Sequence, residues 1–394
     1  MKITIITGLY EPYVRGGAER AVETLVRELK KIHTVSIITT TPWHGMRSLF
    51  PRMWREENTL VYRFYPLNVF SFTSINQMPW VLRFFWHCID VFNIHSYMTV
   101  RGILRREKPD LVWTHNIKGI GYTVPAAIRL LGIQHVHTLH DIQLLEPSGL
   151  LSYKKDINTP SFFSRFYQIC TRFLFGSPNL IVFPSVFLER VYENRGFFSR
   201  SKKIILPNPI LQKIVSVSHI KERSIPVFFY SGQLEPHKGI MLFLRAIDLL
   251  GNMNAKFVFA GSGSLQHTLE EAARHDSRIE YKGFLDRIVL QEYLLESVHF
   301  TVLPTLCYEN APLAVVESLS AGVPIIVSDI GGAAEYIEEG KNGYRITAGD
   351  VGSLLDVLTR ACTMDEYETM RQAAKVSLCG TTPEQYVHTV FSSL

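Results

Sequence analysis

Short apolar runs of strand length alternate with helical patterns along most of this 394-residue chain, and this alternation constrains the fold more than any other feature. Runs at 2–7 and 110–115, for example, are followed by helical patterns at 18–31 and 124–131. Strands that alternate with helices form a parallel sheet with helices on both faces. The other strand-like runs are 34–39, 60–64, 134–140, 180–184, 203–206, 227–230, 257–260, 279–281, 300–303 and 325–327.

The length of the chain exceeds that of one ordinary hydrophobic core, so we expect two domains. Segment 207–226 has a proline at each end and separates the two series of strands, as a domain connector does. The sequence therefore predicts an α/β fold with two Rossmann-like parallel-sheet domains, 1–206 and 227–378, that face each other across a cleft.

The composition is that of a folded globular protein, with 46% hydrophobic and 20% charged residues. The net charge of +5 is spread along the chain without a basic block interleaved with aromatics, which argues against nucleic acid and fits an anionic ligand or membrane surface. The five cysteines contain no C-x-x-C and favour a reducing compartment. No secretion signal or membrane-spanning run is present, so a cytoplasmic protein is expected, with the inner face of the cell membrane as a further site of action.

Two stretches rich in aromatic residues interrupt the regular alternation. They cover 64–102 and 161–175, and both interleave arginines with the aromatics. Such a segment fits a membrane interface, with aromatic rings in the lipid and arginines toward the headgroups. It equally fits a helix that covers the sheet of the first domain. We prefer the covering helix for 161–175, and for 64–102 both interpretations stay open.

The segment 300–317 places two carboxylates after a strand. Its first part is apolar and of strand length, and its last part predicts a helix with Asn310 as the cap and Pro312 in the first turn. Glu309 then falls in the loop before the helix, and Glu317 on the helix itself. Ligands of open α/β sheets bind at the carboxyl ends of the strands, where a carboxylate accepts hydrogen bonds from a polyol.

Other polar and glycine-rich stretches also follow predicted strands. They are Gly16–Gly17, THN at 114–116, His140–Asp141, Lys238, the glycines of GSG at 261–263, and SDIGGAAE at 328–335. Each alone has an ordinary structural explanation, such as a tight turn, a solvated lysine or a core histidine. Their joint placement at the ends of strands is the stronger signal, since independent structural features rarely align in this way.

The order of these motifs resembles that of the family 4 glycosyltransferases, which have the GT-B fold. The similarity covers nearly the whole chain and is specific as a set. It rests on GGAER at 16–20, His-Asp at 140–141, PNP at 207–209, LEPHKG at 234–239, GSG at 261–263, KGF at 282–284, E-x7-E at 309–317, AGVPIIVSDIGG at 321–332 with Glu335, and NGY at 342–344.

The resemblance implies a retaining hexosyltransferase that uses a nucleotide-diphosphate sugar of the UDP or GDP type. A cell-envelope glycan or glycolipid acceptor, as in polysaccharide or lipopolysaccharide biosynthesis, fits the aromatic stretches and the basic charge. Lys238 would lie on the donor diphosphate, and Glu309 would accept hydrogen bonds from the donor sugar. His140 would lie near that sugar and Asp141 on the acceptor side. The resemblance also implies that the last helix, 379–394, crosses back onto the first domain.

The donor-binding residues follow from the same resemblance. Glu317 would hold the ribose hydroxyls, and the first domain's Gly16 and Gly17 would approach the phosphates. The remaining predicted donor contacts are Gln233, Gly261, Gly263, Asn310, Ala311 and Leu313.

Two departures from the family pattern concern this donor site. Gln233 stands where members often have an arginine, so Lys238 has to supply more of the charge stabilisation. Asn310-Ala311-Pro312 replaces a common Gly-Phe-Gly, and because proline has no amide hydrogen, we expect donor contacts from the amides of Ala311 and Leu313. The chain contains no D-x-D and no cluster with metal-ligand spacing, so we expect no cofactor and a metal-independent reaction.

Two alternative functions remain at this point. One is another GT-B catalyst, such as a nucleotide-sugar epimerase, which would process the donor without an acceptor. The other is a scaffold subunit with little or no activity that binds a nucleotide sugar, an interpretation that Gln233 favours. Because Lys238, Glu309, Glu317 and His140 are all present together, we favour the active transferase.

Overall fold

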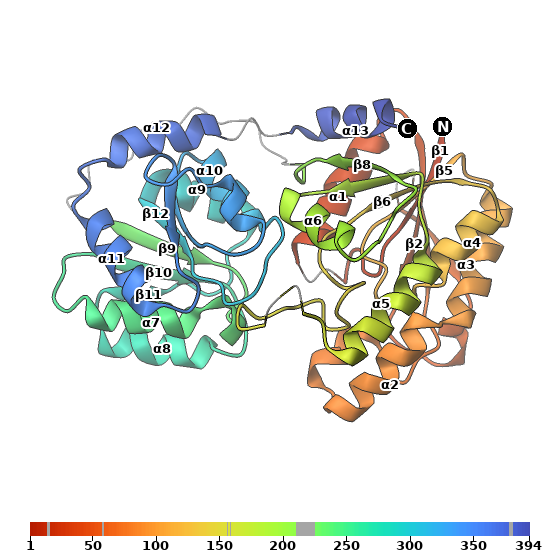
Figure 1. Cartoon of the computed structure of the whole chain (residues 1–394), viewed down its shortest axis with the longest axis horizontal. Helices are drawn as coiled ribbons and strands as arrows, with labels where there is room; N and C mark the ends of the chain where they lie inside the picture. Colours follow the sequence, from red (N-terminus) through yellow and green to blue (C-terminus); the bar gives the residue numbers. More distant parts are fainter. Residues whose placement is uncertain (14–15, 57–58, 156, 158, 210–224, 378–380) are drawn as a thin grey trace. The chain divides into compact units, whose positions relative to one another are not determined.

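The computed structural model describes residues 1–13, 16–56, 59–155, 157, 159–209, 225–377 and 381–394 (Figure 1). It divides the chain into two compact units. Unit 1 comprises Met1–Leu150, Ile157–Leu211 and Thr381–Leu394, and unit 2 comprises Leu151–Asp156 and Gln212–Gly380. Most of the predicted connector, from 210 to 224, lies outside the described residues.

The described part of unit 1 contains an eight-stranded sheet in the order β3-β4-β2-β1-β5-β6-β7-β8. Neighbouring strands are parallel except for the edge pair β3 and β4, which is antiparallel. Strand β3 was not predicted, because all five of its residues are exposed and most are polar or charged. The strands are β1 (Lys2–Ile6), β2 (Thr34–Thr40), β3 (Arg52–Glu56), β4 (Thr59–Phe64), β5 (Leu111–Thr114), β6 (Gln134–Thr138), β7 (Leu180–Phe183) and β8 (Lys202–Ile205).

The last helix of the chain belongs to unit 1, as expected for a GT-B fold (Figure 1). It begins after a capping box, in which Thr382 and Gln385 satisfy each other's backbone amides. Tyr386 and Val390 of this helix share a buried core with Val22 of the first helix. The helices of unit 1 are α1 (Gly17–Leu29), α2 (Trp80–Val91), α3 (Ile94–Glu107), α4 (Val124–Leu130), α5 (Phe162–Phe175), α6 (Val186–Glu193) and α13 (Pro383–Ser392), with short 3-10 turns η1 (Met46–Leu49) and η2 (Phe72–Gln77).

Helix α5 packs on unit 1 and reaches the sheet through Phe175, whose ring centroid lies 4.6 Å from that of His137 on β6, as expected for the covering helix that we preferred for 161–175. Its buried face is mostly polar: Gln168 and Thr171 donate to the carbonyls of Leu145 and Leu144 at 3.2 and 2.7 Å. Most of its phenylalanines point to solvent instead. No described helix combines the length and apolar character that a membrane crossing requires.

The described residues of unit 2 form a six-stranded, fully parallel sheet in the order β11-β10-β9-β12-β13-β14. Phe228, Phe257 and Phe300 stack on neighbouring strands at its centre, with ring centroids 5.4 and 5.6 Å apart. Only β14 was not predicted. The strands are β9 (Val227–Ser231), β10 (Lys256–Ala260), β11 (Ile279–Tyr281), β12 (Phe300–Leu303), β13 (Ile325–Ser328) and β14 (Gly343–Ile346).

The helices of unit 2 connect these strands and cover the sheet. They are η3 (Pro236–Lys238), α7 (Ile240–Leu249), α8 (Gln266–His275), α9 (Arg287–Ser297), α10 (Leu313–Ser320), η4 (Ala333–Tyr336), α11 (Val351–Cys362) and α12 (Tyr367–Ser377). One short segment from the first half of the chain also belongs here, and the predicted division into 1–206 and 227–378 did not include it. The amide of Tyr153 donates to the carbonyl of Leu306 at 2.9 Å, and the amide of Tyr308 donates to Leu151 at 2.9 Å.

Candidate functional site

The strongest candidate site lies at the carboxyl ends of β9 and β12, which are neighbours in the unit 2 sheet. The loop after β9 contains Lys238, and the loop after β12 contains Glu309. The Lys238 Nζ lies 2.9 Å from the Glu309 Oε1, and the two side chains are only 18% and 13% exposed. Two residues 71 positions apart are thus brought together by the parallel sheet, at the edge where α/β proteins bind ligands.

The charge of Lys238 depends on this pair. Burial by itself favours the neutral amine, but the nearby Glu309 carboxylate attracts the cation and accepts its hydrogen bond, so the pKa of Lys238 is raised. Lys238 is therefore an ammonium ion over the whole physiological range. A charged, mostly buried ammonium group at a strand end is suited to binding a phosphate oxygen.

The loop that holds Lys238 is fixed against the loop after β12. Gly239 follows Lys238 with a φ of +78°, and a Cβ at this position would lie 1.9 Å from the carbonyl oxygen of Pro304. The amide of Leu306 also donates to the carbonyl of His237 at 2.8 Å. A side chain at 239 would push these two loops apart, so the position of Lys238 requires a glycine.

A second glycine supports Glu309 from the other side. Gly331 has a φ of +71°, and a Cβ there would lie 2.3 Å from the carbonyl oxygen of Glu309. The amide of Gly332 donates to that same oxygen at 2.7 Å. The Gly331–Gly332 pair after β13 therefore fixes the backbone of Glu309, a role that the sequence did not reveal.

The other predicted donor residues of unit 2 lie on the same edge of its sheet. Gln233 is exposed in the loop after β9, and its carbonyl accepts a hydrogen bond from the Tyr230 hydroxyl at 2.7 Å. Gly261 and Gly263 lie in the loop after β10, which packs on the β9 loop through a 2.9 Å hydrogen bond from the Leu234 amide to the Ser262 carbonyl. The three residues therefore border the Lys238 loop.

The start of α10 corrects one detail of the prediction. The helix begins at Leu313 with Pro312 at the cap position, so Asn310 lies two residues before the cap and does not occupy it. Asn310 and Ala311 form the loop between Glu309 and the helix, where the first helical amides have no intrahelical acceptor. Glu317 is half-buried just over one turn into α10.

In unit 1, His140 follows β6 and pairs with a histidine from the end of β5. The Nδ1 of His115 lies 3.0 Å from the Nε2 of His140, and the rings stack with centroids 5.3 Å apart. Burial lowers the pKa of His140 to about 4, and burial together with the neighbouring histidines lowers that of His115 well below its ordinary value. Both rings are therefore neutral near pH 7, and one donates to the other. The motif at 114–116 pointed to this region, but the pairing depends on the tertiary structure.

Asp141, next to His140, is a perturbed carboxyl group. Burial raises its pKa to about 6, although its Oδ1 accepts a hydrogen bond from the Gln143 amide at 2.8 Å. The hydroxyl of Tyr192 donates to the Asp141 carbonyl at 3.0 Å and fixes the backbone. A carboxyl group with a pKa near neutrality is suited to proton transfer or to hydrogen bonding with a polyol.

Gly16 and Gly17 form the start of α1, as predicted. The Gly16 amide donates to the Oε2 of Glu19 at 2.8 Å, and Glu19 is buried. The first amide of this glycine turn therefore already has a carboxylate as its acceptor in the structure.

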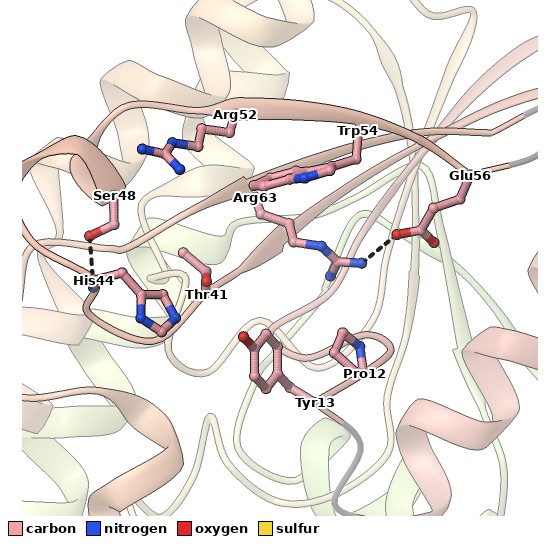
Figure 2. A pocket seen from close by; sticks show the side chains of 9 residues that line it. All are labelled: Pro12, Tyr13, Thr41, His44, Ser48, Arg52, Trp54, Glu56 and Arg63. Carbon is pink, nitrogen blue, oxygen red and sulfur yellow. Dashed lines mark hydrogen bonds and ion pairs between the residues drawn. The ribbon is translucent and has the colours of Figure 1, made fainter.

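Unit 1 also contains a pocket of about 370 Å³ that the sequence did not predict (Figure 2). It is built from the loops after β1 and β2 and from the edge pair β3 and β4. Its side chains include two arginines, the aromatic rings of Tyr13, His44 and Trp54, and three hydroxyl groups. The lining residues are Pro12, Tyr13, Thr41, His44, Ser48, Arg52, Trp54, Glu56 and Arg63. Among the described residues of the whole chain, no three His, Cys, Asp or Glu side chains are grouped so as to hold a metal ion.

Comparisons with known proteins agree with the architecture. The solved structures that resemble this chain include sucrose-phosphate synthase from Thermosynechococcus elongatus, with a TM-score of 0.75, 14% identity and coverage of 99% of this chain and 97% of that one. HepE from Anabaena in complex with UDP matches with a TM-score of 0.71 and 17% identity over 100% of both chains. These likenesses establish the GT-B fold.

The sequence comparisons identify the family. A curated relative from Escherichia coli, UDP-Gal:alpha-D-GlcNAc-diphosphoundecaprenol alpha-1,3-galactosyltransferase, is 27% identical over 288 residues, which are 68% of this chain and 70% of the relative. The family model "Glycosyltransferase Family 4" matches residues 15–210, and the model "Glycosyl transferases group 1" matches residues 225–363. The chain is thus a transferase of glycan biosynthesis with the GT-B fold, and it belongs to the family 4 glycosyltransferases.

Proposed function

We propose that this enzyme transfers a hexose, with retention of configuration, from a nucleotide-diphosphate sugar to a cell-envelope glycan or lipid-linked acceptor. The observation that supports it best is the buried Lys238–Glu309 ion pair at the ligand-binding edge of unit 2. The Escherichia coli relative uses a UDP-sugar and a diphosphoundecaprenol-linked acceptor, and HepE binds UDP. A uridine nucleotide is therefore the first donor to test.

In this proposal Lys238 stabilises the diphosphate as it leaves the sugar. Negative charge on the leaving group is largest in the transition state, so a preorganised ammonium group acts most strongly there. Glu309 accepts hydrogen bonds from hydroxyls of the donor sugar and keeps Lys238 in position. The acceptor hydroxyl attacks from the side on which the diphosphate departs, and the departing phosphate takes the acceptor proton. The new glycosidic bond then has the configuration of the old one.

We further propose that the reaction needs no metal ion. Lys238 and the amides at the start of α10 would provide the positive potential that a divalent cation provides in other transferases. Full activity in excess chelator is the expected result. Loss of activity in chelator, restored by Mg²⁺ or Mn²⁺, would contradict this part of the proposal.

The decisive experiment measures nucleotide release from UDP-, GDP- and ADP-sugars, for the wild type, Glu309→Ala and Glu338→Ala. Glu338 is a matched control, since it forms an exposed ion pair with Lys341 in the same unit. Slow release from one donor, lost in Glu309→Ala and kept in Glu338→Ala, would support the proposal. Donor binding without release, even with a membrane extract as acceptor source, would favour the scaffold. Epimerisation of the donor sugar without transfer would favour the epimerase.

We also propose that unit 1 contacts an anionic membrane surface from the cytoplasmic side. The polar face of α5 is bonded to the protein, while Phe162, Phe163 and Phe173 are 80%, 78% and 81% exposed. Trp80, at the start of α2, is 74% exposed. Aromatic rings that face solvent beside arginines suit a lipid interface with anionic headgroups.

Vesicle flotation tests this contact. The wild type should float with phosphatidylglycerol vesicles, and the double variant Phe163→Ser/Phe173→Ser should remain at the bottom of the gradient. Phe284→Ser is the control, because Phe284 is an exposed phenylalanine of unit 2, at 66%. Equal flotation of the double variant and the wild type would contradict the proposed surface.

A further inference from the structure

The unit 1 pocket contains two arginines close together, an arrangement that costs free energy unless an anion binds between them. Strand β3 points every second side chain into it, so that Arg52, Trp54 and Glu56 line the pocket. Arg55, between the last two, is absent from the lining and belongs to the opposite face of the strand. One face of strand β3 therefore lines the pocket, and this face carries Arg52, one of the two arginines of the strand.

Two arginines face each other directly across this edge of the sheet. In the antiparallel register of β3 and β4, Arg52 is the partner of Arg63. Like charges at opposed positions destabilise a strand pair. Glu56 compensates only one of them, with its Oε1 2.9 Å from the Arg63 Nη2. Within the described part of the chain, no carboxylate or other hydrogen-bonding group engages the Arg52 side chain.

Arg63 retains an unused donor although it is buried. Its side chain is 7% exposed, and its second terminal nitrogen, Nη1, is buried without any hydrogen-bond partner. Figure 2 shows the guanidinium between Trp54 and the Pro12–Tyr13 loop, with only one edge turned to Glu56. A buried N–H group of a charged side chain without an acceptor is costly, so the pocket is completed when an oxygen acceptor enters it.

We propose that this pocket binds an anionic group, a carboxylate or a phosphate, carried by the acceptor glycan. Arg52 and the free Nη1 of Arg63 donate to its oxygens, since a planar guanidinium matches both groups geometrically. Trp54 and Tyr13 offer ring faces against which a neighbouring sugar packs. This inference rests on the proposed transferase function, and it names the chemical class of the acceptor.

Isothermal titration with three small sugars tests the inference, with UDP present to occupy the nucleotide site. The sugars are methyl glucoside, methyl glucuronide and glucose 6-phosphate, which are neutral, carboxylated and phosphorylated. The wild type should bind at least one charged sugar about tenfold more tightly than the neutral one, as a charge-assisted hydrogen bond provides. A preference for the glucuronide would identify a uronic-acid acceptor, and a preference for the phosphate would identify a phosphorylated one.

Two variants of the same strand separate this pocket from general electrostatic attraction. Arg52→Gln should abolish most of the preference for the charged sugar, and Arg55→Gln, which removes the same charge from the opposite face, should keep it. Glu56→Gln should increase the affinity for the charged sugar severalfold, because it removes the negative charge that lies beside the proposed anion site. Equal binding of neutral and charged sugars by the wild type, or equal loss in Arg52→Gln and Arg55→Gln, would overturn the inference.

The same titrations distinguish failure of this inference from failure of the proposed function. Binding of UDP, GDP and ADP, measured before the sugars are added, tests the donor site proposed for unit 2. A protein that binds no uridine, guanosine or adenosine nucleotide but shows Arg52-dependent sugar binding would support the anion pocket and refute the transferase proposal. UDP binding without Arg52-dependent binding of a charged sugar would refute the anion pocket and leave the transferase proposal standing.

Discussion

The candidate binding sites of the two units differ in how tightly their loops pack and in how their charges are balanced. In unit 2 the loops after β9, β12 and β13 touch backbone to backbone, and they hold one buried ion pair, Lys238–Glu309. In unit 1 the pocket beside β3 has a volume of about 370 Å³ and carries an excess of positive charge, with Arg52 opposite Arg63. The unit 2 site thus holds the Lys238 and Glu309 side chains in one position, whereas the unit 1 pocket has more hydrogen-bond donors on its arginines than acceptors to pair with them.

This difference matches the two tasks of a glycosyltransferase. A nucleotide diphosphate and its reacting bond require fixed geometry, because misplacement of the charge that stabilises the transition state is costly. An acceptor glycan requires instead a pocket large enough for a sugar ring and side chains that bind its polar groups. In the function that we propose, the glycines at 239 and 331 serve the first task, and the arginines and aromatic rings around Trp54 serve the second.

The largest effect should follow from removing the cation of the rigid site. Lys238→Ala should lower kcat/KM by about 10² to 10³, mainly through kcat, because the lost interaction is strongest in the transition state. Steady-state kinetics with the natural donor measure both constants. Lys256→Ala is the control, since Lys256 forms a more exposed ion pair with Glu280. Unchanged kcat in Lys238→Ala would refute the assigned role.

The rigidity of that site is tested by two glycines with the same backbone conformation. Gly331 and Gly340 have φ values of +71° and +72°, but a Cβ at 331 would meet the Glu309 carbonyl at 2.3 Å, whereas at 340 the nearest atom is an arginine nitrogen at 3.7 Å. Gly331→Ala should therefore lower both Tm and kcat, and Gly340→Ala should lower Tm only, by the strain of about 1 kcal/mol that a positive φ imposes. Equal kcat in the two variants would show that Gly331 does not support Glu309.

Acid should unfold unit 1 before unit 2. Burial lowers the pKa of His140 to about 4, that of His135 to about 3 and that of His137 well below 6.5. Below pH 6.5 the unfolded histidines bind protons that the folded ones do not, so stability is lost as pH falls, by about 1.4 kcal/mol per pH unit for each excess proton. The raised pKa values of Asp90 and Asp141, about 7 and 6, act in the opposite direction. We expect the histidine contribution to be the larger one.

The tryptophans make this difference measurable, since all of them belong to unit 1: Trp43, Trp54, Trp80, Trp86 and Trp113. Their fluorescence should change between pH 6.5 and 4, while circular dichroism retains the signal of unit 2. In His140→Gln the fluorescence transition should move to lower pH. Coincident transitions in both signals would contradict the predicted order.

The smallest effect concerns Gln233, which departs from the family pattern at the donor site that we propose. Gln233 is exposed beside the Lys238 loop, so Gln233→Arg adds a second cation without disturbing the core. We expect kcat/KM to rise severalfold, since a solvent-exposed charge contributes less than a buried one. Gln233→Met, which adds no charge, is the matched control. An equal response to both variants would show that position 233 does not contact the diphosphate.

The sequence determined the fold class, and it named most residues of the donor site that we propose. The parallel sheets followed from alternating runs, because strands buried on both faces consist of continuous apolar residues. Lys238, Glu309, Gly261 and Gly263 were named because they follow predicted strands and match the motif order of the family 4 glycosyltransferases. The exposed edge strand β3 has no apolar pattern in the sequence, so neither the strand nor the place of its arginines in a pocket was predicted.

Only the tertiary structure decided which distant residues meet. Three contacts depend on strand order and register, which local sequence does not specify. They are the His115–His140 pair, the support of Glu309 by Gly331, and the opposition of Arg52 and Arg63. The orientation of α5 was likewise decided by hydrogen bonds to the loop at 144–146, which turn its polar face inward and its phenylalanines toward solvent. Residue type and spacing set the chemistry available to this chain, and the packing of its sheets set where that chemistry is placed.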